Sequence, residues 1–322
     1  MNDRLYVLGI DGGGTRSRAL LADLNESTLA QHESGASNPN VVGFDTAADN
    51  LAQAIRECCT QAACDLSRLG VIVLGLAGMG RQADRETLRQ AVALRLFDSE
   101  SQAMPIIVES DARIALEGAF SGNPGIILIG GTGSIVMGKT HRGEILRVGG
   151  WGRLLGDEGS GFSIGREALV SVTHDIDNRS YAGGLRKLLS QRLHWNSRDD
   201  IVEAVYRDNF DLASLAPIVM EAAQANDLVA QKILDQAANL LVEQCSALVR
   251  QMGVSVKMGL VLFGGLVQED TIYAKTVQMK LLKTLPQVEV RPPLRSAVEG
   301  AVIMGIQKLK GRSPIPQHDI SG

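Results

Sequence analysis

Two short stretches of the sequence combine glycines with hydroxyl residues at places where we predict tight turns. Residues 10–15 read IDGGGT, and residues 129–134 read IGGTGS. Glycines leave backbone N–H groups accessible to phosphate oxygens, and a threonine or serine hydroxyl adds another donor. One such turn is explained equally well as a hairpin without a ligand. Two copies at equivalent points of the chain favour phosphate binding, although neither matches GxxxxGK[ST] or opens a strand–helix unit with GxGxxG.

Two carboxylates stand at the ends of predicted strands. Asp11 ends the first strand, where it could face a metal ion or its waters. Asp111 follows a later strand and starts a helix, so we predict it as the helix N-cap at the sheet edge where α/β proteins place ligands. A plain cap is the simpler interpretation of Asp111 alone. Beside two glycine turns, however, it could accept a proton from a substrate hydroxyl, an effect of about 10²–10⁴ in rate.

A glycine-rich loop over residues 149–161 contains Trp151, one of only two tryptophans, together with Asp157 and Glu158. A sugar suits such a loop, because its apolar ring face packs on an indole while its hydroxyls donate to carboxylates. The alternative is a core tryptophan in a flexible connection. A glycine-rich connection of this length is uncommon without a function, which favours the binding interpretation.

Other catalytic chemistries fit the sequence poorly. Residues 161–165 read GFSIG, which matches the nucleophile motif of serine hydrolases, but no strand precedes it as that motif requires. Five histidines without HExxH argue against a histidine metal site. The four cysteines have no zinc-site spacing, and we predict them as buried thiols in helices: Cys58, Cys59, Cys64 and Cys245.

The elements that must position these residues occur twice. Three strands are predicted over residues 5–11, 17–24 and 28–33, followed by helices alternating with strands over 71–76 and 106–109. The pattern restarts with strands over 125–130, 135–140 and 144–148, and after several helices come strands over 260–263 and 288–290 and a last helix over 296–309. This order predicts two copies of one α/β topology, each a mixed sheet with helices on its faces.

Composition restricts the class of partner. The 322 residues suit two domains, and 45% hydrophobic with 21% charged residues is typical of a globular protein. With 32 basic and 36 acidic residues the net charge is −4, so no overall positive field is available to bind nucleic acid or an anionic membrane. We find no apolar run of about 18 residues and no signal peptide. The sequence therefore predicts a cytoplasmic protein.

Taken in order, IDGGGTR, ESDARIAL, IILIGGTGSIVMG, VLFGGL and SAVEGAVIMG resemble the phosphate, connecting and adenosine motifs of the actin, sugar-kinase and Hsp70 ATPase superfamily. GASNPNVVG, GLAGMGR and VGGWGRLLGDEGSGF narrow the resemblance to the BadF/BadG/BcrA/BcrD ATPase family, and within it to the N-acetylglucosamine kinases. The resemblance extends from Leu5 to about Lys308.

The resemblance implies a pair of ribonuclease-H-like domains, as in actin-like ATPases, with a central cleft. It implies that ATP, with Mg²⁺, phosphorylates the 6-hydroxyl of an amino sugar, N-acetylglucosamine being the expected one. We expect an N-terminal domain over residues 1–118 and a C-terminal domain over 119–310 with a helical insert near 161–252. The helix over 296–309 would pack back on the first domain, and 311–322 would form a disordered tail.

The resemblance also assigns roles to residues of this sequence. Asp111 matches the catalytic base, and Asp11 would bind the metal through water. ATP would contact three glycine-rich sites: Gly13, Gly14 and Thr15; Gly131, Thr132, Gly133 and Ser134; and Gly264 with Gly265. The sugar would contact Asn38, Gly150, Trp151 and Asp157.

Three alternatives stay open. After GTGS the animal enzymes carry an asparagine where this chain has Ile135, so glucosamine could replace its acetylated form as the substrate. A dehydratase-activator ATPase of the same family would carry an iron–sulfur cluster between subunits, which three cysteines within one helix do not favour. A non-catalytic sugar sensor would keep the fold without the reaction. The sequence does not decide whether the chain forms a homodimer.

Overall fold

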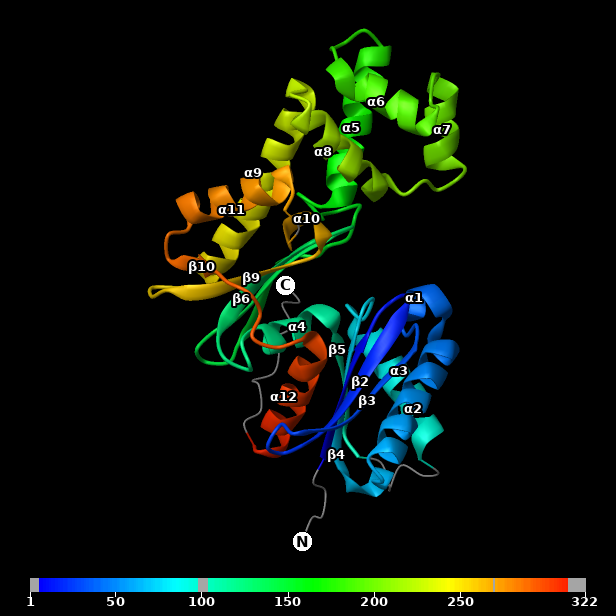
Figure 1. The fold of residues 1–322 in the computed structure, drawn as a ribbon, viewed down its shortest axis with the longest axis vertical. Coiled ribbons are helices and arrows are strands. Elements are labelled where there is room, and N and C mark those ends of the chain that lie inside the picture. The colour runs from blue at the N-terminus through cyan, green and yellow to red at the C-terminus, as the bar shows by residue number, and fades with distance from the viewer. Residues whose placement is uncertain (1–5, 98–103, 269, 312–322) are drawn as a thin grey trace. The chain divides into compact units, whose positions relative to one another are not determined.

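A computed structural model describes residues 6–97, 104–268 and 270–311. These residues fall into two compact units (Figure 1). The first unit comprises the described residues within Met1–Gly125, Lys139–Ile145 and Pro292–Gly322, and the second those within Ile126–Gly138 and Leu146–Arg291. Each unit contains one five-stranded sheet with helices packed on it.

The first unit has a mixed sheet in the order β3-β2-β1-β4-β5. The first three strands form an antiparallel meander, and β4 and β5 then add in parallel to β1. Every residue of β4 is buried, as its continuous apolar sequence predicts for a central parallel strand. The strands are β1 (Tyr6–Gly12), β2 (Arg16–Asp23), β3 (Thr28–Gly35), β4 (Leu69–Leu76) and β5 (Ile106–Ser110).

Helices cover both faces of the first sheet. On one face, α2 (Phe44–Gln61) and α3 (Gln82–Leu96) pack on alternate residues such as Leu8 and Ile10 of β1. On the other, α12 (Ala297–Leu309) packs with Ile114 of α4 (Asp111–Ala119). This alternation follows from the two-residue period of a strand. A short helix, α1 (Pro39–Val42), follows β3.

The second unit repeats the topology of the first. Its sheet has the order β10-β9-β6-β7-β8. Read from β8 to β10, this sheet places its third, second, first, fourth and fifth strands side by side, as the first sheet does. The predicted duplication of one mixed-sheet topology is therefore confirmed. The strands are β6 (Gly125–Gly130), β7 (Ser134–Lys139), β8 (Ile145–Gly149), β9 (Met258–Phe263) and β10 (Val288–Val290).

Seven α-helices are seen in the described part of the second unit, five of them between β8 and β9. A single helix was predicted over residues 211–225, but a 3-10 turn at Leu212–Leu215 precedes α8. The reason is Pro217, which lacks an N–H and is tolerated only in the first turn of a helix. The helices are α5 (Gly161–Ile176), α6 (Gly183–Leu193), α7 (Arg198–Tyr206), α8 (Ala216–Gln224), α9 (Leu228–Gln251), α10 (Gly265–Gln268) and α11 (Ile272–Thr284).

Helices α4 and α12, each of which follows the fifth strand of its sheet, cross within the first unit at two glycines. A Cβ on Gly300 would lie 2.0 Å from the carbonyl oxygen of Ile114, and one on Gly118 would lie 2.2 Å from that of Ser296. Only glycine allows backbones this close. The predicted domain limits at 1–118 and 119–310 stay a prediction, and the tail predicted for 311–322 lies, apart from Gly311, outside the described residues.

A buried ion cluster joins α4 to the end of β7 in the first unit. Glu117 is fully buried; the ammonium of Lys139 donates to its two carboxylate oxygens at 2.9 and 2.8 Å and to the carbonyl of Gly122 at 2.8 Å. Arg113, one turn earlier in α4, also pairs with Glu117. Both positive charges compensate one buried carboxylate, which would otherwise be costly to remove from water.

The cysteine prediction holds for three of the four thiols. Cys58 and Cys59 are buried in α2, and Cys245 is buried in α9. The prediction is wrong for Cys64, which lies half-buried after the helix, because Ala63 has a left-handed backbone (φ +49°) that ends α2. Burial raises the pKa of the Cys58 thiol to about 11 and that of Cys59 to about 12, so both remain protonated at neutral pH.

Candidate functional site

The carboxyl ends of three parallel strands meet at one edge of the first sheet. The register places Asp11 of β1 beside Gly75 of β4, and Gly75 beside Glu109 of β5. A Cβ on Gly75 would lie 2.3 Å from the Cδ1 atom of Ile114, so the missing side chain lets α4 approach β4. This edge therefore brings Asp11 and the first turn of α4 to one side of the sheet.

Asp111 is the first residue of α4 and not its N-cap. The cap is Ser110, which has an extended backbone and whose hydroxyl accepts a hydrogen bond from the N–H of Arg113 at 3.2 Å. The prediction of Asp111 as the cap was wrong by one residue, because serine at the preceding position already supplies the capping oxygen. The Oδ1 atom of Asp111 accepts from the N–H of Ala112 at 2.8 Å.

Two carboxylates at this edge have raised pKa values. Burial raises the pKa of Asp111 above its ordinary value. The pKa of Asp11 is also raised, first by burial and then by the negative charge of Asp111, while Arg18 opposes the shift. Raised values are typical of carboxylates that exchange protons or hold cations.

A magnesium ion fits this donor set. Mg²⁺ binds to proteins through one or two carboxylates and completes its shell with water and substrate phosphates. Asp11 and Asp111 supply such oxygens, and a cation would relieve their repulsion. Among the residues that the structure describes, no cluster of three or more His, Cys, Asp or Glu forms a complete protein cage for a metal.

The first glycine hairpin is fixed by backbone hydrogen bonds to its neighbours. The carbonyl of Gly13 accepts from the N–H groups of Ser37 at 3.0 Å and Asn38 at 3.1 Å. The carbonyl of Gly12 accepts from the N–H of Ala77, which follows β4, at 2.9 Å. The hairpin and the segments after β3 and β4 therefore form one connected group of loops.

The glycines of this hairpin differ in what surrounds them. A Cβ on Gly12 would lie 2.0 Å from the hydroxyl oxygen of Ser37, so Gly12 is required for packing. On Gly13 and Gly14 the nearest atoms would be 3.4 and 3.5 Å away, which is ordinary contact. Gly14 and Thr15 are exposed. This backbone is accessible to a ligand, as the phosphate prediction requires.

Asn38 lies in the same group of loops. Its Oδ1 atom accepts from the N–H of Asn40 at 3.0 Å, which caps α1. A Cβ on Gly78 would lie 2.6 Å from this oxygen and 2.6 Å from the Nδ2 atom of Asn40, and Gly78 itself has φ +84°. Gly78 therefore provides the space in which the two asparagine side chains lie against the loop after β4.

The second glycine hairpin is anchored differently, within the second unit. The N–H of Ser134 donates to the Oδ1 atom of Asp157 at 3.2 Å, and its hydroxyl donates to the carbonyl of Glu158 at 2.8 Å. The carbonyl of Gly131 accepts from the N–H of Gly161 at 2.8 Å. A Cβ on Gly131 would meet nothing within 4 Å, so this backbone is open too.

The loop that carries Trp151 presents its aromatic side chain to solvent, as predicted. Trp151 is 67% exposed, and the guanidinium of Arg147 lies 5.7 Å from the centre of its ring. The end of the loop is held in the core, where the hydroxyl of buried Tyr273 donates to the carbonyl of Gly159 at 2.6 Å. The loop thus has a fixed base and an exposed aromatic tip.

Two further glycines of the predicted site are explained by the fold. Gly264 has φ +92°, and a Cβ on it would lie 2.4 Å from the carbonyl oxygen of Gly130. Gly150 has φ +70°, and a Cβ there would lie 2.8 Å from the Cδ1 atom of Ile135. Contacts with a nucleotide or sugar at these two residues, and at Gly265, which begins α10, stay predictions.

The serine-hydrolase motif is not a nucleophile elbow. Ser163 lies in the first turn of α5, where its N–H donates to the hydroxyl of Ser160, the N-cap. The preceding residues form turns and no strand, as predicted.

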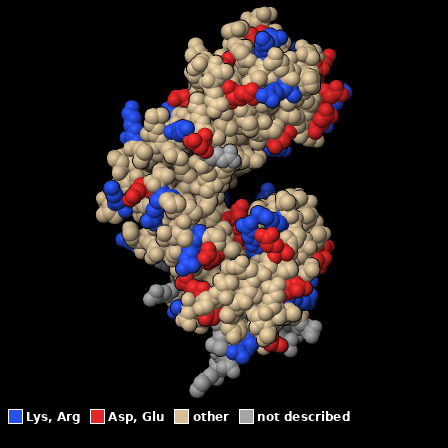
Figure 2. All heavy atoms as spheres, viewed as in Figure 1, with Lys and Arg blue, Asp and Glu red and all other residues tan. Residues whose placement is uncertain are grey.

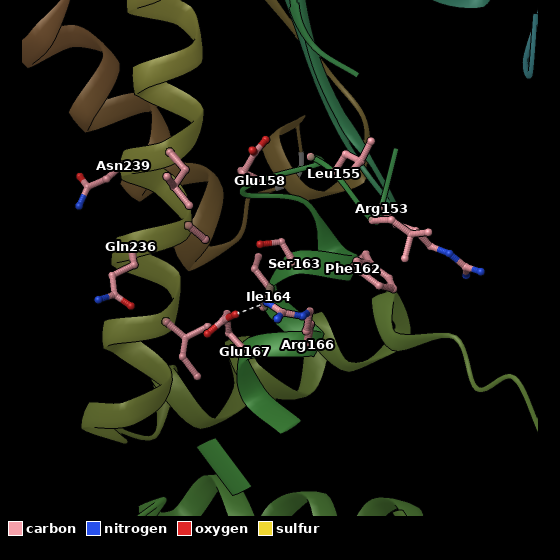
Figure 3. A pocket seen from close by; sticks show the side chains of 15 residues that line it. Arg153, Leu155, Glu158, Phe162, Ser163, Ile164, Arg166, Glu167, Gln236 and Asn239 are labelled. Atoms are coloured by element: carbon pink, nitrogen blue, oxygen red, sulfur yellow. Dashed lines mark hydrogen bonds and ion pairs between the residues drawn. The ribbon is translucent and has the colours of Figure 1, made fainter. Parts of the chain in front are cut away.

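A hollow of about 740 Å³ opens in the second unit between α5, α9 and the loop at residues 153–158 (Figure 3). Figure 3 shows Glu158 at its upper side, Arg153 and Phe162 at the right, and Gln236 and Asn239 on α9. None of the residues predicted to bind nucleotide or sugar lines it.

The surface shown in Figure 2 carries intermingled basic and acidic side chains over both units. Across the described residues, we find no helix with the length and hydropathy needed to span a membrane.

Comparison with known proteins gives consistent matches along the chain. A sequence profile of the BadF/BadG/BcrA/BcrD ATPase family matches residues 8–305. The chain is 31% identical over 303 residues to the N-acetylmuramic acid/N-acetylglucosamine kinase of Clostridium acetobutylicum, covering 93% of this chain and 97% of that protein. It is 29% identical over 324 residues to the N-acetyl-D-glucosamine kinase of Dictyostelium discoideum, covering 96% and 100%.

Among solved structures, the chain is similar to a Chromobacterium violaceum protein for which N-acetylglucosamine kinase activity has been suggested. The TM-score is 0.69 at 25% identity, and the similarity covers 95% of this chain and 100% of that one. Together with the repeated strand order, this similarity confirms the predicted duplicated ribonuclease-H-like architecture.

Proposed function

Because the chain belongs to the BadF/BadG/BcrA/BcrD ATPase family, we propose that it is an amino-sugar kinase. It transfers the γ-phosphoryl group of ATP to the 6-hydroxyl of N-acetylglucosamine. The single observation that carries this proposal is the edge of the first sheet, where Asp111 and Asp11, whose pKa values are both raised, lie with Asn38 and an open glycine hairpin. The kinase names of two relatives that align over more than nine-tenths of the chain support it.

Asp111 serves as the base in this mechanism. Its carboxylate accepts the proton of the sugar 6-hydroxyl while that oxygen forms a bond to the γ-phosphorus and the bond from γ-phosphorus to the bridging oxygen breaks. The products are the sugar 6-phosphate and ADP, and the proton passes from Asp111 to solvent. A raised pKa suits this role, because a stronger base accepts a hydroxyl proton more readily.

Backbone donors and charge neutralisation complete the transfer. The phosphate oxygens contact the hairpin of Gly13, Gly14 and Thr15 in the first unit and the hairpin of Gly131 to Ser134 in the second, with Gly264 and Gly265 near the adenosine. The N–H groups of Gly13, Gly131 and Ser134 already donate within the protein, so they shape these hairpins while the other residues supply the donors. When bound, Mg²⁺ supplies the positive charge that neutralises the phosphate oxygens. Asp11 would hold it through water.

The sugar is recognised by an aromatic face and polar side chains. Trp151 packs on the apolar face of the ring, and Asn38, Asp157 and the backbone of Gly150 bind its hydroxyls. Since the Oδ1 atom of Asp157 already accepts from Ser134, the same carboxylate connects the sugar loop to the second glycine hairpin. We place the enzyme in the cytoplasm, where ATP is available.

Glucosamine is the second candidate substrate, and one observation favours it. Ile135, which follows the second glycine hairpin, packs its Cδ1 atom against Gly150 of the sugar loop and offers no hydrogen bond there. An acetamido group that needs a polar partner at this point would gain nothing from the isoleucine.

A coupled assay of ADP release across N-acetylglucosamine, glucosamine, N-acetylmuramic acid and glucose tests the proposal, with mass spectrometry locating the phosphate. Sugar-dependent turnover fastest with N-acetylglucosamine is expected, and fastest turnover with glucosamine selects the second candidate. ATP hydrolysis independent of every sugar, together with protein-bound iron, would identify a dehydratase activator. Sugar binding without turnover would identify a sensor, and either result rejects the kinase.

A further inference from the structure

Arg85, on the first turn of α3, connects the loop after β4 to strand β5 in the first unit. Its Nε–H donates to the carbonyl of Met79 at 2.7 Å, and its NH1 group donates to the Oε2 atom of Glu109 at 2.8 Å. Both charged side chains are largely buried, at 13% exposure for Arg85 and 20% for Glu109. Neither residue belongs to the predicted site.

Each end of this bridge leads to a residue of the candidate site. Met79 follows Gly78, whose missing side chain makes room for Asn38 and Asn40. Glu109 lies on β5, two residues before Asp111, and is separated from Asp11 by β4 alone. One guanidinium therefore joins the loop that packs against the proposed sugar-binding asparagine to the strand end that carries the proposed base.

The geometry requires arginine in particular. A planar guanidinium donates in two directions at once, to the carbonyl through Nε and to the carboxylate through NH1, whereas a lysine ammonium on a flexible stem cannot span the same two acceptors in that arrangement. Arg85 also compensates the charge of Glu109. Without it, a third partly buried carboxylate would lie uncompensated at the edge that already holds Asp11 and Asp111.

We propose that Arg85, with Glu109, is a positioning residue that fixes the Asn38 loop and the Asp111 strand end relative to each other, and so aligns the sugar hydroxyl with its base. This inference rests on the proposed kinase function. Misplacement of reacting groups by about 1 Å can reduce turnover by about 10²-fold. The loss should therefore appear in kcat and in the KM for the sugar, and not in the KM for ATP.

A matched control lies on the same helix. Arg95, near the end of α3, also donates to a carboxylate, that of Asp49, and to a carbonyl, that of Ala91, but it joins α3 to α2. We compare Arg85→Ala, Arg85→Lys and Glu109→Gln with Arg95→Ala and the unaltered protein. Steady-state kinetics in both substrates, thermal unfolding and hydrogen exchange of residues 76–81 and 109–113 are measured for each.

Arg85→Ala is expected to lower kcat by about 10- to 100-fold and to raise the sugar KM several-fold, with the ATP KM unchanged. Arg85→Lys and Glu109→Gln, which each keep one contact, should lose less. Arg95→Ala should lose stability without losing kcat. Exchange at both segments should accelerate in Arg85→Ala and not in Arg95→Ala.

Equal kcat values in Arg85→Ala and Arg95→Ala would overturn the inference, as would unchanged exchange at both segments. If Arg85→Ala does not fold, kcat within twofold of the unaltered protein in both Arg85→Lys and Glu109→Gln overturns it. If the unaltered protein phosphorylates no amino sugar, the proposed function itself fails and the inference falls with it. That outcome is seen in the unaltered protein alone and is distinct from a failure confined to the variants.

Discussion

The two units share one strand order but carry different chemistry at corresponding strand ends. The first strand of the first sheet ends in Asp11 and Gly12, whereas its counterpart β6 ends in Ile129 and Gly130. The fifth strand of the first sheet leads into Asp111, whereas its counterpart β10 leads into Arg291. The strand order is the same in both units, whereas the carboxylates stand at these positions only in the first unit.

The loops after the third and fourth strands show the same relation. Asn38 follows β3, and Trp151 follows its counterpart β8. Gly78 follows β4 with φ +84°, and Gly264 follows β9 with φ +92°. Left-handed glycines are thus kept at matched turns, while the polar or aromatic side chains beside them differ. The two units therefore share the backbone geometry of these turns and differ in the side chains at the loop ends.

Removing the acid that only the first unit has after its fifth strand should reduce turnover more than any other substitution. Asp111→Asn keeps the shape but cannot accept a proton, so kcat should fall by about 10²–10⁴. Sugar-dependent ADP release measures turnover, and ATP binding by calorimetry should be unchanged. Turnover within tenfold of the unaltered protein would assign the base to another residue.

The buried ion cluster of the first unit can be compared with a surface pair of the second. Lys139→Met leaves Glu117 with Arg113 alone and should cost about 3–5 kcal/mol in the free energy of unfolding. Lys280→Met removes a more exposed pair with Asp235 and should cost about 0–1 kcal/mol. Denaturant unfolding measures both. Equal losses would mean that the cluster does not stabilise the position of α4.

Two glycines of the second unit separate backbone strain from ligand contact. Gly264→Ala forces a left-handed backbone and a close contact with Gly130, and should lower the free energy of unfolding by about 1–3 kcal/mol. Gly131→Ala enters open space and should change stability by less than about 1 kcal/mol while raising the ATP KM several-fold. An unchanged ATP KM in Gly131→Ala would remove this hairpin from the nucleotide site.

Trp151→Ala tests the loop after β8, which corresponds to the loop after β3 that carries Asn38. The indole is mostly exposed, so its loss should leave stability unchanged and raise the sugar KM by about tenfold, the loss expected from a missing aromatic contact of about 1.4 kcal/mol. Leu154→Ala, in the same loop and 89% exposed, is the control. If both variants behave alike, the tryptophan does not contact the sugar.

The smallest expected effect is a pH dependence of stability. Burial raises the pKa of Asp111 in the folded protein, and the pKa of Asp11 is raised as well. Between the ordinary and the raised values the folded protein binds more protons than the unfolded chain, so stability decreases as pH rises through this range. Melting temperatures of the unaltered protein should show this decrease, and Asp111→Asn should flatten it. The acid limb of kcat over KM should lie above the ordinary aspartate pKa for the same reason. An identical slope in the variant would contradict the assignment.

Local sequence determined a large part of this protein. Buried strands such as β4 were predictable from continuous apolar residues, and the glycine hairpins from their composition, because both depend on neighbours within a few residues. The duplication of one topology followed from the repeated spacing of these signals. Even α7 had a local signal that the predictions missed, a capping box between Ser197 and Asp200.

Tertiary structure decided which of these features belong together. Arg85 meets Glu109, and Glu117 meets Lys139, across more than 20 residues of sequence, and no local pattern marks either pair. Likewise, the glycines that pack, such as Gly12 and Gly264, look the same in sequence as Gly13 and Gly131, which are open. The sequence shows that a glycine has no side chain. Only the packed structure determines whether another atom fills the space where a Cβ would lie.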